Sequence, residues 1–106
     1  MNYQQIELGN GKRRVILEGD FDAVALSDGE LRPWLESLAE EASGDIYLDL
    51  SGVSFLDSSG IGAMVFLFKR LKARNLALEI VQPLGQPRQL LEMLRIHEAI
   101  PVQLVA

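Results

Sequence analysis

Apolar and polar residues alternate in several short segments of the chain, and a period of two is typical of β-strands. The clearest case is segment 45–50, in which Ile46, Leu48 and Leu50 share one face. Ser51-Gly52 and Ser54 then interrupt the alternation, which predicts that this strand ends before them. By the same pattern we expect further strands over residues 3–8, 14–18, 76–81 and 100–105.

The first two of these strands are expected to form a hairpin. Asn10-Gly11 lies between them, and Asn-Gly is a strong turn signal because both residues tolerate positive φ angles. Residues 19–22, Gly-Asp-Phe-Asp, are expected to form a break after the second strand.

Helical spacing occurs in three other segments. In the first, Ser27 or Asp28 is the candidate N-cap of an apolar stripe, and Ser43-Gly44 follows it. Pro33 must lie in the first turn of this helix or kink it, because a proline deeper inside costs about 3 kcal/mol. The stripe consists of Leu31, Trp34, Leu35, Leu38 and Ala42.

The second helix is expected over about residues 60–74. Its first half, 61–68, is apolar nearly all round, and its second half carries basic residues that oppose the negative end of the helix dipole. Pro87 fits the first turn of a third helix, whose apolar stripe is Leu90, Leu91 and Leu94.

Strands and helices therefore alternate after the opening hairpin, which predicts an α/β fold. Right-handed crossovers give a mixed, mostly parallel sheet with helices packed on it and the antiparallel N-terminal hairpin at one edge. A length of 106 residues, 48% of them apolar, suits one domain over 1–106 with one core.

Charge and composition narrow the functional classes. The net charge of −5 argues against nucleic acid as the main partner, and it disfavours an anionic membrane surface. The absence of cysteine excludes disulfides, cysteine nucleophiles and thiolate zinc sites. No apolar run is long enough for membrane insertion, and the N-terminus lacks the pattern of a secretory signal, so we expect a cytoplasmic location.

The candidate chemistry lies in Asp57-Ser58-Ser59-Gly60, which joins a buried strand to a helix N-terminus. Ser59 is the expected N-cap, which places Ser58 just outside the helix with its hydroxyl at the loop tip. Such a site can hold an anion on free N–H groups, or it can carry a phosphate covalently on Ser58. The plainer alternative is a turn with a cap and no further role.

Catalytic and metal-binding alternatives have weaker support. His97 is the only histidine, and its spacing from Ser58 does not indicate a hydrolase. The segment around Ser58 and Ser59 also lacks the Gly-x-Ser-x-Gly motif. A carboxylate metal site built from Asp20, Asp22 and Asp57 is a remaining alternative. We expect no enzyme activity and no cofactor.

The segment Asp49-Leu-Ser-Gly-Val-Ser-Phe-Leu-Asp-Ser-Ser-Gly-Ile-Gly resembles the signature of the STAS domain, and more closely that of bacterial anti-sigma factor antagonists. Residues 19–22 match the Gly-x-x-Asp of that family, residues 57–60 match its phosphorylation loop, and 87–96 resemble its third helix. The resemblance covers essentially the whole chain and implies the STAS fold.

The resemblance also implies a mechanism of partner switching. Ser58 is the carried-over phosphorylation site, modified by a serine protein kinase that often doubles as the anti-sigma factor, and a PP2C-type phosphatase removes the phosphate. The unphosphorylated form binds the kinase and frees its other client. The implied partner-binding residues are Asp22, Asp57, Ser58, Ser59, Gly60, Ile61 and Gly62.

Two alternatives follow from the same resemblance. Some STAS domains are non-switching subunits of transport or other assemblies, and some relatives bind small molecules near this loop.

Family members commonly carry a further helix after the last strand, which this sequence lacks, and the exposed sheet face could then serve a homodimer contact.

Overall fold

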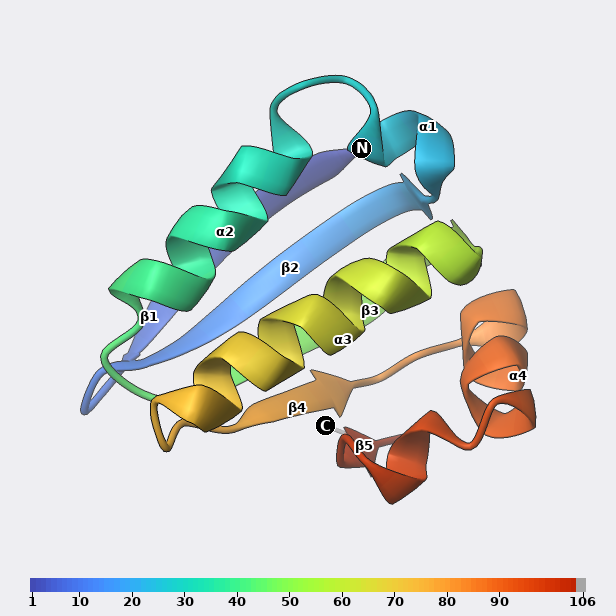
Figure 1. Cartoon of the computed structure of the whole chain (residues 1–106). Helices are drawn as coiled ribbons and strands as arrows, with labels where there is room; N and C mark the ends of the chain where they lie inside the picture. The colour runs from blue at the N-terminus through green and yellow to red at the C-terminus, as the bar shows by residue number, and fades with distance from the viewer. Residues whose placement is uncertain (105–106) are drawn as a thin grey trace.

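The five strands lie in the order β1-β2-β3-β4-β5, and only β1 and β2 are antiparallel (Figure 1). The computed structural model describes residues 1–104. It confirms the mixed, mostly parallel sheet with an N-terminal hairpin. The elements are β1 (Asn2–Gly9), β2 (Lys12–Phe21), α1 (Ala23–Leu26), α2 (Leu31–Glu41), β3 (Ile46–Leu56), α3 (Ser58–Ala73), β4 (Leu78–Val81), α4 (Gly85–Met93), the 3-10 helix η1 (Ile96–Glu98) and β5 (Val102–Gln103).

The turn between β1 and β2 has the predicted geometry. Asn10 and Gly11 have φ angles of 55° and 77°, and two positive values in succession match the twist of the flanking strands. The hairpin is also held from the helix side, where the rings of Tyr3 and Trp34 lie 4.4 Å apart. Trp34 therefore packs against the core, as its place on the apolar stripe predicts.

Strands β2 and β3 are longer than predicted. The expected break at 51–54 is wrong and that at 19–22 is confined to Asp22, because the two strands remain paired as far as Phe21 and Leu56. The register between them shifts twice, between Ile16 and Glu18 and between Gly19 and Asp20. Such shifts disturb the alternation of side chains without ending the strand, which is why the period of two in the sequence stops before the strand does.

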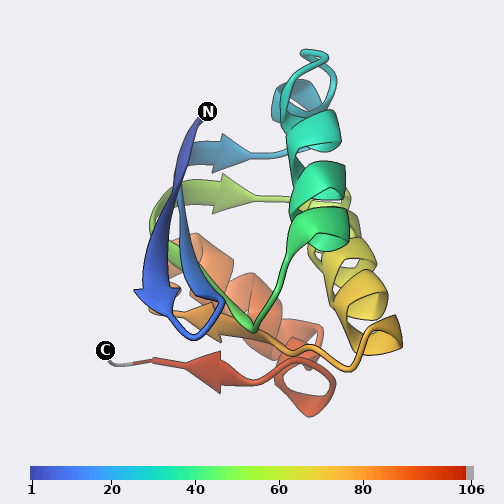
Figure 2. The same ribbon diagram turned by 90° about the vertical axis from the view of Figure 1, so that its left-hand side faces the viewer.

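Helices α2 and α3 pack side by side on one face of the sheet (Figure 2). Their apolar faces bury residues such as Leu35 and Leu67 against Leu17, Leu48 and Ile80 of the strands. This layer is the core, and the apolar stripe predicted for α2 faces it.

The N-cap of α2 is Glu30, which makes no side-chain capping hydrogen bond, so the prediction of Ser27 or Asp28 as the N-cap is wrong. Asp28 Oδ1 nevertheless accepts the N–H of Glu30 at 2.9 Å and that of Leu31 at 3.3 Å, just before and at the first residue of the helix. Pro33 lies in the first turn, where it interrupts no helical hydrogen bond.

The C-terminal third is only partly as predicted. Pro87 lies in the first turn of α4, but the last strand covers only Val102–Gln103, and Val105 lies outside the described residues. Two elements were not predicted, α1 and η1, since four and three residues are too few to show a helical period. Within residues 1–104, no helix has the length and apolar character needed to cross a bilayer.

Candidate functional site

Residues 57–60, here called the serine loop, lie at the carboxyl edge of the sheet where β3 passes into α3 (Figure 1). Helix α1, which follows β2, contacts the start of α3. The side chain of Ser58 is exposed and that of Ser59 is half-buried. Two βα connections thus meet around one exposed serine.

The N-cap of α3 is Asp57, and the prediction that Ser59 caps the helix is wrong. Asp57 Oδ1 accepts the N–H groups of Ser59 at 2.9 Å and Gly60 at 3.0 Å. Ser58 is therefore the first residue of the helix and does not lie outside it. A carboxylate at this position also interacts favourably with the positive end of the helix dipole, which a hydroxyl does not.

The other carboxylate oxygen of Asp57 joins α3 to α1. Asp57 Oδ2 accepts the N–H of Ala23 at 3.1 Å, at the first residue of α1. The N–H of Gly60, followed by those of Ala23 and Ser59, lowers the pKa of Asp57 despite the opposing effect of desolvation. The carboxylate is therefore ionised at neutral pH. Because the N–H groups of Ser59 and Gly60 are already occupied, the loop does not offer them to a separate anion.

Asp22 lies beside the serine loop. It is the N-cap of α1, and its Oδ1 accepts the N–H of Ala25 at 2.9 Å. The next residue, Ala23, is the one that donates to Asp57. Among residues 1–104 no group of three or more potential ligands is placed to hold a metal ion, so Asp20, Asp22 and Asp57 do not form the carboxylate site considered above.

The two glycines of this segment have different environments. A Cβ on the buried Gly60 would collide with the carbonyl oxygen of Phe21 and would lie 2.6 Å from Leu56 Cδ1. A Cβ on the exposed Gly62 would meet nothing within 4 Å. Gly60 therefore serves the close approach of α3 to β2, whereas Gly62 leaves an open place on the surface next to the half-buried Ile61.

Gln86 is a residue of this region that the sequence reasoning missed. Its Oε1 accepts the N–H of Leu56 at 2.8 Å, and its Nε2 donates to the carbonyl oxygen of Leu56 at 2.8 Å. Leu56 directly precedes Asp57. No periodic pattern in a single sequence marks such a contact, since it joins residues 30 positions apart.

Exposed apolar side chains stand on the three elements that meet at this edge. Val24 of α1 is 76% exposed, Leu84 before α4 is 52% exposed, and Phe55 near the end of β3 is 42% exposed. The edge thus combines the acidic groups Asp22 and Asp57 with apolar surface, which is a combination suited to a protein partner.

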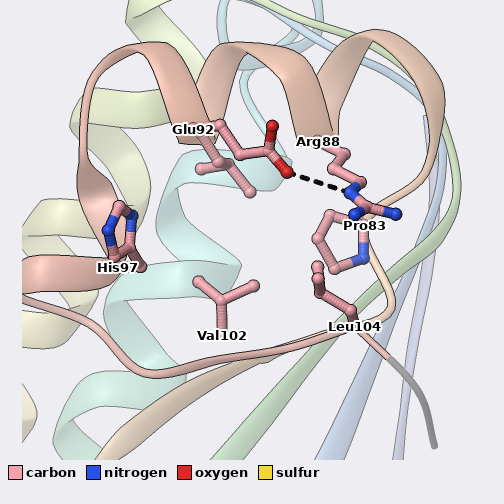
Figure 3. Close-up of a pocket in the computed structure, with 7 residues that line it drawn as sticks. Pro83, Arg88, Glu92, His97, Val102 and Leu104 are labelled. Carbon is pink, nitrogen blue, oxygen red and sulfur yellow. Dashed lines mark hydrogen bonds and ion pairs between the residues drawn. The ribbon is translucent and has the colours of Figure 1, made fainter.

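His97 lies elsewhere, at a cleft of about 320 Å³ between α4, η1 and β5 (Figure 3). The Arg88–Glu92 ion pair, 3.0 Å long, stands on the α4 side of this cleft. Neither Ser58 nor Ser59 lines it, so the structure does not bring His97 to the serine loop. The lining residues are Pro83, Arg88, Leu91, Glu92, His97, Val102 and Leu104.

Comparisons with solved structures place this fold among known domains. The anti-sigma factor antagonist SpoIIAA in its unphosphorylated form is 20% identical, with a TM-score of 0.72 over 99% of this chain and 89% of that chain. Bacillus SpoIIAA in its phosphorylated form is 19% identical, with a TM-score of 0.72 over 95% of this chain and 90% of that chain.

Two further structures extend the comparison. An anti-sigma factor antagonist from Mycobacterium paratuberculosis is 18% identical, with a TM-score of 0.79 over 96% of this chain and 86% of that chain. A sulfate transporter family protein from Wolinella succinogenes is 16% identical, with a TM-score of 0.72 over 90% of this chain and 78% of that chain. These TM-scores show that the chain shares their fold.

Two comparisons of the sequence bear on the family. The one with curated proteins finds no match. The sequence model of the STAS domain, in contrast, matches residues 14–105, which include the serine loop and nearly the whole chain. The chain therefore belongs to the STAS domain family.

Proposed function

We propose that this STAS domain is a phosphorylation-regulated anti-sigma factor antagonist in the cytoplasm. The unphosphorylated form binds a serine protein kinase that acts as the anti-sigma factor, and phosphorylation of Ser58 releases it. The γ-phosphoryl group of ATP passes to Ser58 Oγ, with loss of the hydroxyl proton and departure of ADP. A PP2C-type phosphatase hydrolyses the phosphoserine to restore the hydroxyl and release inorganic phosphate. The domain is the substrate of these enzymes and has no catalytic role.

The observation that carries the proposal is the placement of Ser58. It is the exposed serine of a loop whose backbone is held by Asp57, and exposed apolar side chains stand on α1, near the end of β3 and before α4. SpoIIAA, which has the same fold, is a protein solved in both unphosphorylated and phosphorylated forms. A serine in this setting is accessible to a kinase and also lies inside a surface suited to binding one.

The electrostatics of the loop explain how a phosphate would act. A phosphoserine adds about −1.5 to −2 charges. The N–H groups of Ser59 and Gly60 are already bonded to the ionised Asp57, so these two donors are not free to offset the added charge. The phosphate therefore adds charge and bulk to the contact surface. A loss of about 3 kcal/mol of binding free energy weakens binding more than a hundredfold.

The deciding experiment is phosphosite mapping of the protein recovered from its native cells, together with its intact mass. We expect a phosphate on Ser58 that disappears in Ser58→Ala and persists in the matched variant Ser59→Ala. A phosphate that follows Ser59, or none in any growth condition, contradicts the proposal.

The second candidate function is that of a non-switching STAS subunit in a transport assembly. The structural likeness to a sulfate transporter family protein favours it. An unphosphorylated Ser58 combined with co-purification of membrane transport proteins would support this function, whereas recovery of a serine kinase would exclude it.

A further inference from the structure

Strand β3, which leads into the serine loop, has a strand neighbour on only one side over its last residues. Its pairing with β4 ends at Asp49 and Val81, whereas its pairing with β2 continues to Phe21 and Leu56. Helix α4 lies beyond the end of β4 (Figure 1). The free side of β3 therefore needs partners for its backbone groups that do not come from a strand.

Gln86, the second residue of α4, supplies such partners to Leu56, the last residue of β3. A primary amide carries both a donor and an acceptor, so one side chain can bond to the N–H and the C=O of the same residue, as a neighbouring strand would. Gln86 does so with Leu56, at 2.8 Å in each direction. Leu56 has a fully buried side chain and Gln86 is half-buried, so the pair is shielded from much of the competing water.

We propose that Gln86 is a positioning residue for Ser58: its paired hydrogen bonds to Leu56 fix the backbone before Asp57, so that the loop presents the serine to its kinase in one conformation. The inference rests on the proposed function. Asp57 fixes the loop from the α1 side through Ala23, and Gln86 fixes it from the α4 side. A partner that binds an ordered loop does not have to supply the free energy of ordering it.

The test variant is Gln86→Glu. A carboxylate can still accept the N–H of Leu56, but it cannot donate to the carbonyl oxygen and places a negative charge against it. The control is Gln89→Glu, which introduces the same charge on an exposed position of the same helix. Within residues 1–104, the side chain of Gln89 makes no hydrogen bond with another residue.

The first measurement is the initial rate of phosphoryl transfer to the purified protein, with radiolabelled ATP and the kinase activity of a lysate of the native cells. We expect Gln86→Glu to raise KM about tenfold with little change in maximal rate, because the loop must be ordered on binding. Because the protein is the substrate of the kinase, a smaller folded fraction would also raise the apparent KM. The substrate concentration is therefore taken as that of the folded protein, measured by circular dichroism, and a merely structural role then leaves the corrected KM unchanged. An unchanged KM, or one raised equally by Gln89→Glu, overturns the proposal.

The second measurement does not depend on a kinase. In Gln86→Glu at neutral pH, the Leu56 amide should exchange its hydrogen faster, and the amide resonances of Ser58 and Ser59 should shift. Protonation of the introduced carboxylate restores a donor and an acceptor, so these resonances should return toward their wild-type positions as the pH is lowered. If the resonances and the exchange rate match those of the wild type at neutral pH, Gln86 does not order the loop.

The two measurements separate the two ideas. Failure of the wild-type protein to take phosphate on Ser58 contradicts the proposed function, and the positioning of Ser58 for a kinase falls with it. The amide data then still show whether Gln86 orders the loop. Phosphorylation of wild type and variant with equal KM contradicts the positioning role alone.

Discussion

Gly60 packs directly against the carbonyl oxygen of Phe21, so α3 begins in contact with the end of β2. A methyl group has no room at this position, because it would collide with that oxygen and would lie 2.6 Å from Leu56 Cδ1. We therefore predict that Gly60→Ala lowers the free energy of unfolding by about 1–3 kcal/mol, the usual cost of overpacking. Urea denaturation of the purified variant measures this loss.

The same substitution two residues later is the control. Gly62→Ala meets open space and replaces a helical glycine, so it should raise the free energy of unfolding by up to about 1 kcal/mol. Equal stability of the two variants would show that the close approach at Gly60 is not required.

Arg14 and Asp49 form an ion pair across β2 and β3. Asp49 Oδ2 lies 2.8 Å from Arg14 Nη2, and Asp49 is only 6% exposed in the centre of the sheet. Burial by itself raises the pKa of Asp49, but hydrogen bonds from Ser51 and Arg14 outweigh it and lower the pKa, so the group is ionised.

We predict that Arg14→Leu lowers the free energy of unfolding by about 1–3 kcal/mol, because it leaves a buried carboxylate oxygen without its partner. The double variant Arg14→Leu with Asp49→Leu should recover part of this loss. Arg13→Leu, which removes the neighbouring arginine and its exposed hydrogen bond to Gln5, should change stability little. Thermal and urea unfolding of the four proteins give the comparison, and a loss in Arg13→Leu as large as that in Arg14→Leu would contradict it.

Asp57 should make the stability of the protein depend on pH. Its pKa is lowered in the folded state, chiefly by the N–H of Gly60, so its contribution is present above the pKa of an unfolded aspartate, about 3.9. That contribution is lost as the pH falls through the lower folded value. We therefore predict that Asp57→Asn melts several degrees below the wild type at pH 6 and that the gap closes toward pH 2.

Asp20→Asn is the matched control for this series. Within residues 1–104 the carboxylate of Asp20 accepts no hydrogen bond, and it lies near the same edge of the sheet. Its melting temperature should follow that of the wild type throughout. A constant gap between Asp57→Asn and the wild type would mean that the charge of Asp57 does not matter.

Much of the fold could be predicted from local patterns, because those patterns report on burial. The stripe that includes Leu35 and Leu38 predicts α2, because these residues form the buried face of that helix. Asn10-Gly11 predicts the hairpin, because these two residues form its turn. The extension of β3 to Leu56 could not be predicted, because it depends on pairing with β2 through two register shifts.

The candidate site shows the same limit. The position of Ser58 was available from its motif, but the identity of the N-cap was not. Asp57 and Ser59 are both capping residues, and the choice between them depends on where the first turn begins, which varies by one or two residues in any sequence-based assignment. The contacts of Gln86 with Leu56 and of Asp57 with Ala23 join segments far apart in the chain, so only the folded structure reveals them.

The switch itself predicts opposite behaviour for two substitutions at one position. Ser58→Ala cannot be phosphorylated and keeps a small side chain, so it should stay bound to the kinase partner. Ser58→Asp places a permanent charge beside the ionised Asp57, so it should bind at least about tenfold more weakly, an energy difference of about 1.4 kcal/mol. Ser37→Asp adds the same charge on the exposed side of α2 and should bind as the wild type does. Titration of the isolated kinase partner with the four proteins measures the affinities, and equal binding by Ser58→Ala and Ser58→Asp would exclude an electrostatic switch at Ser58.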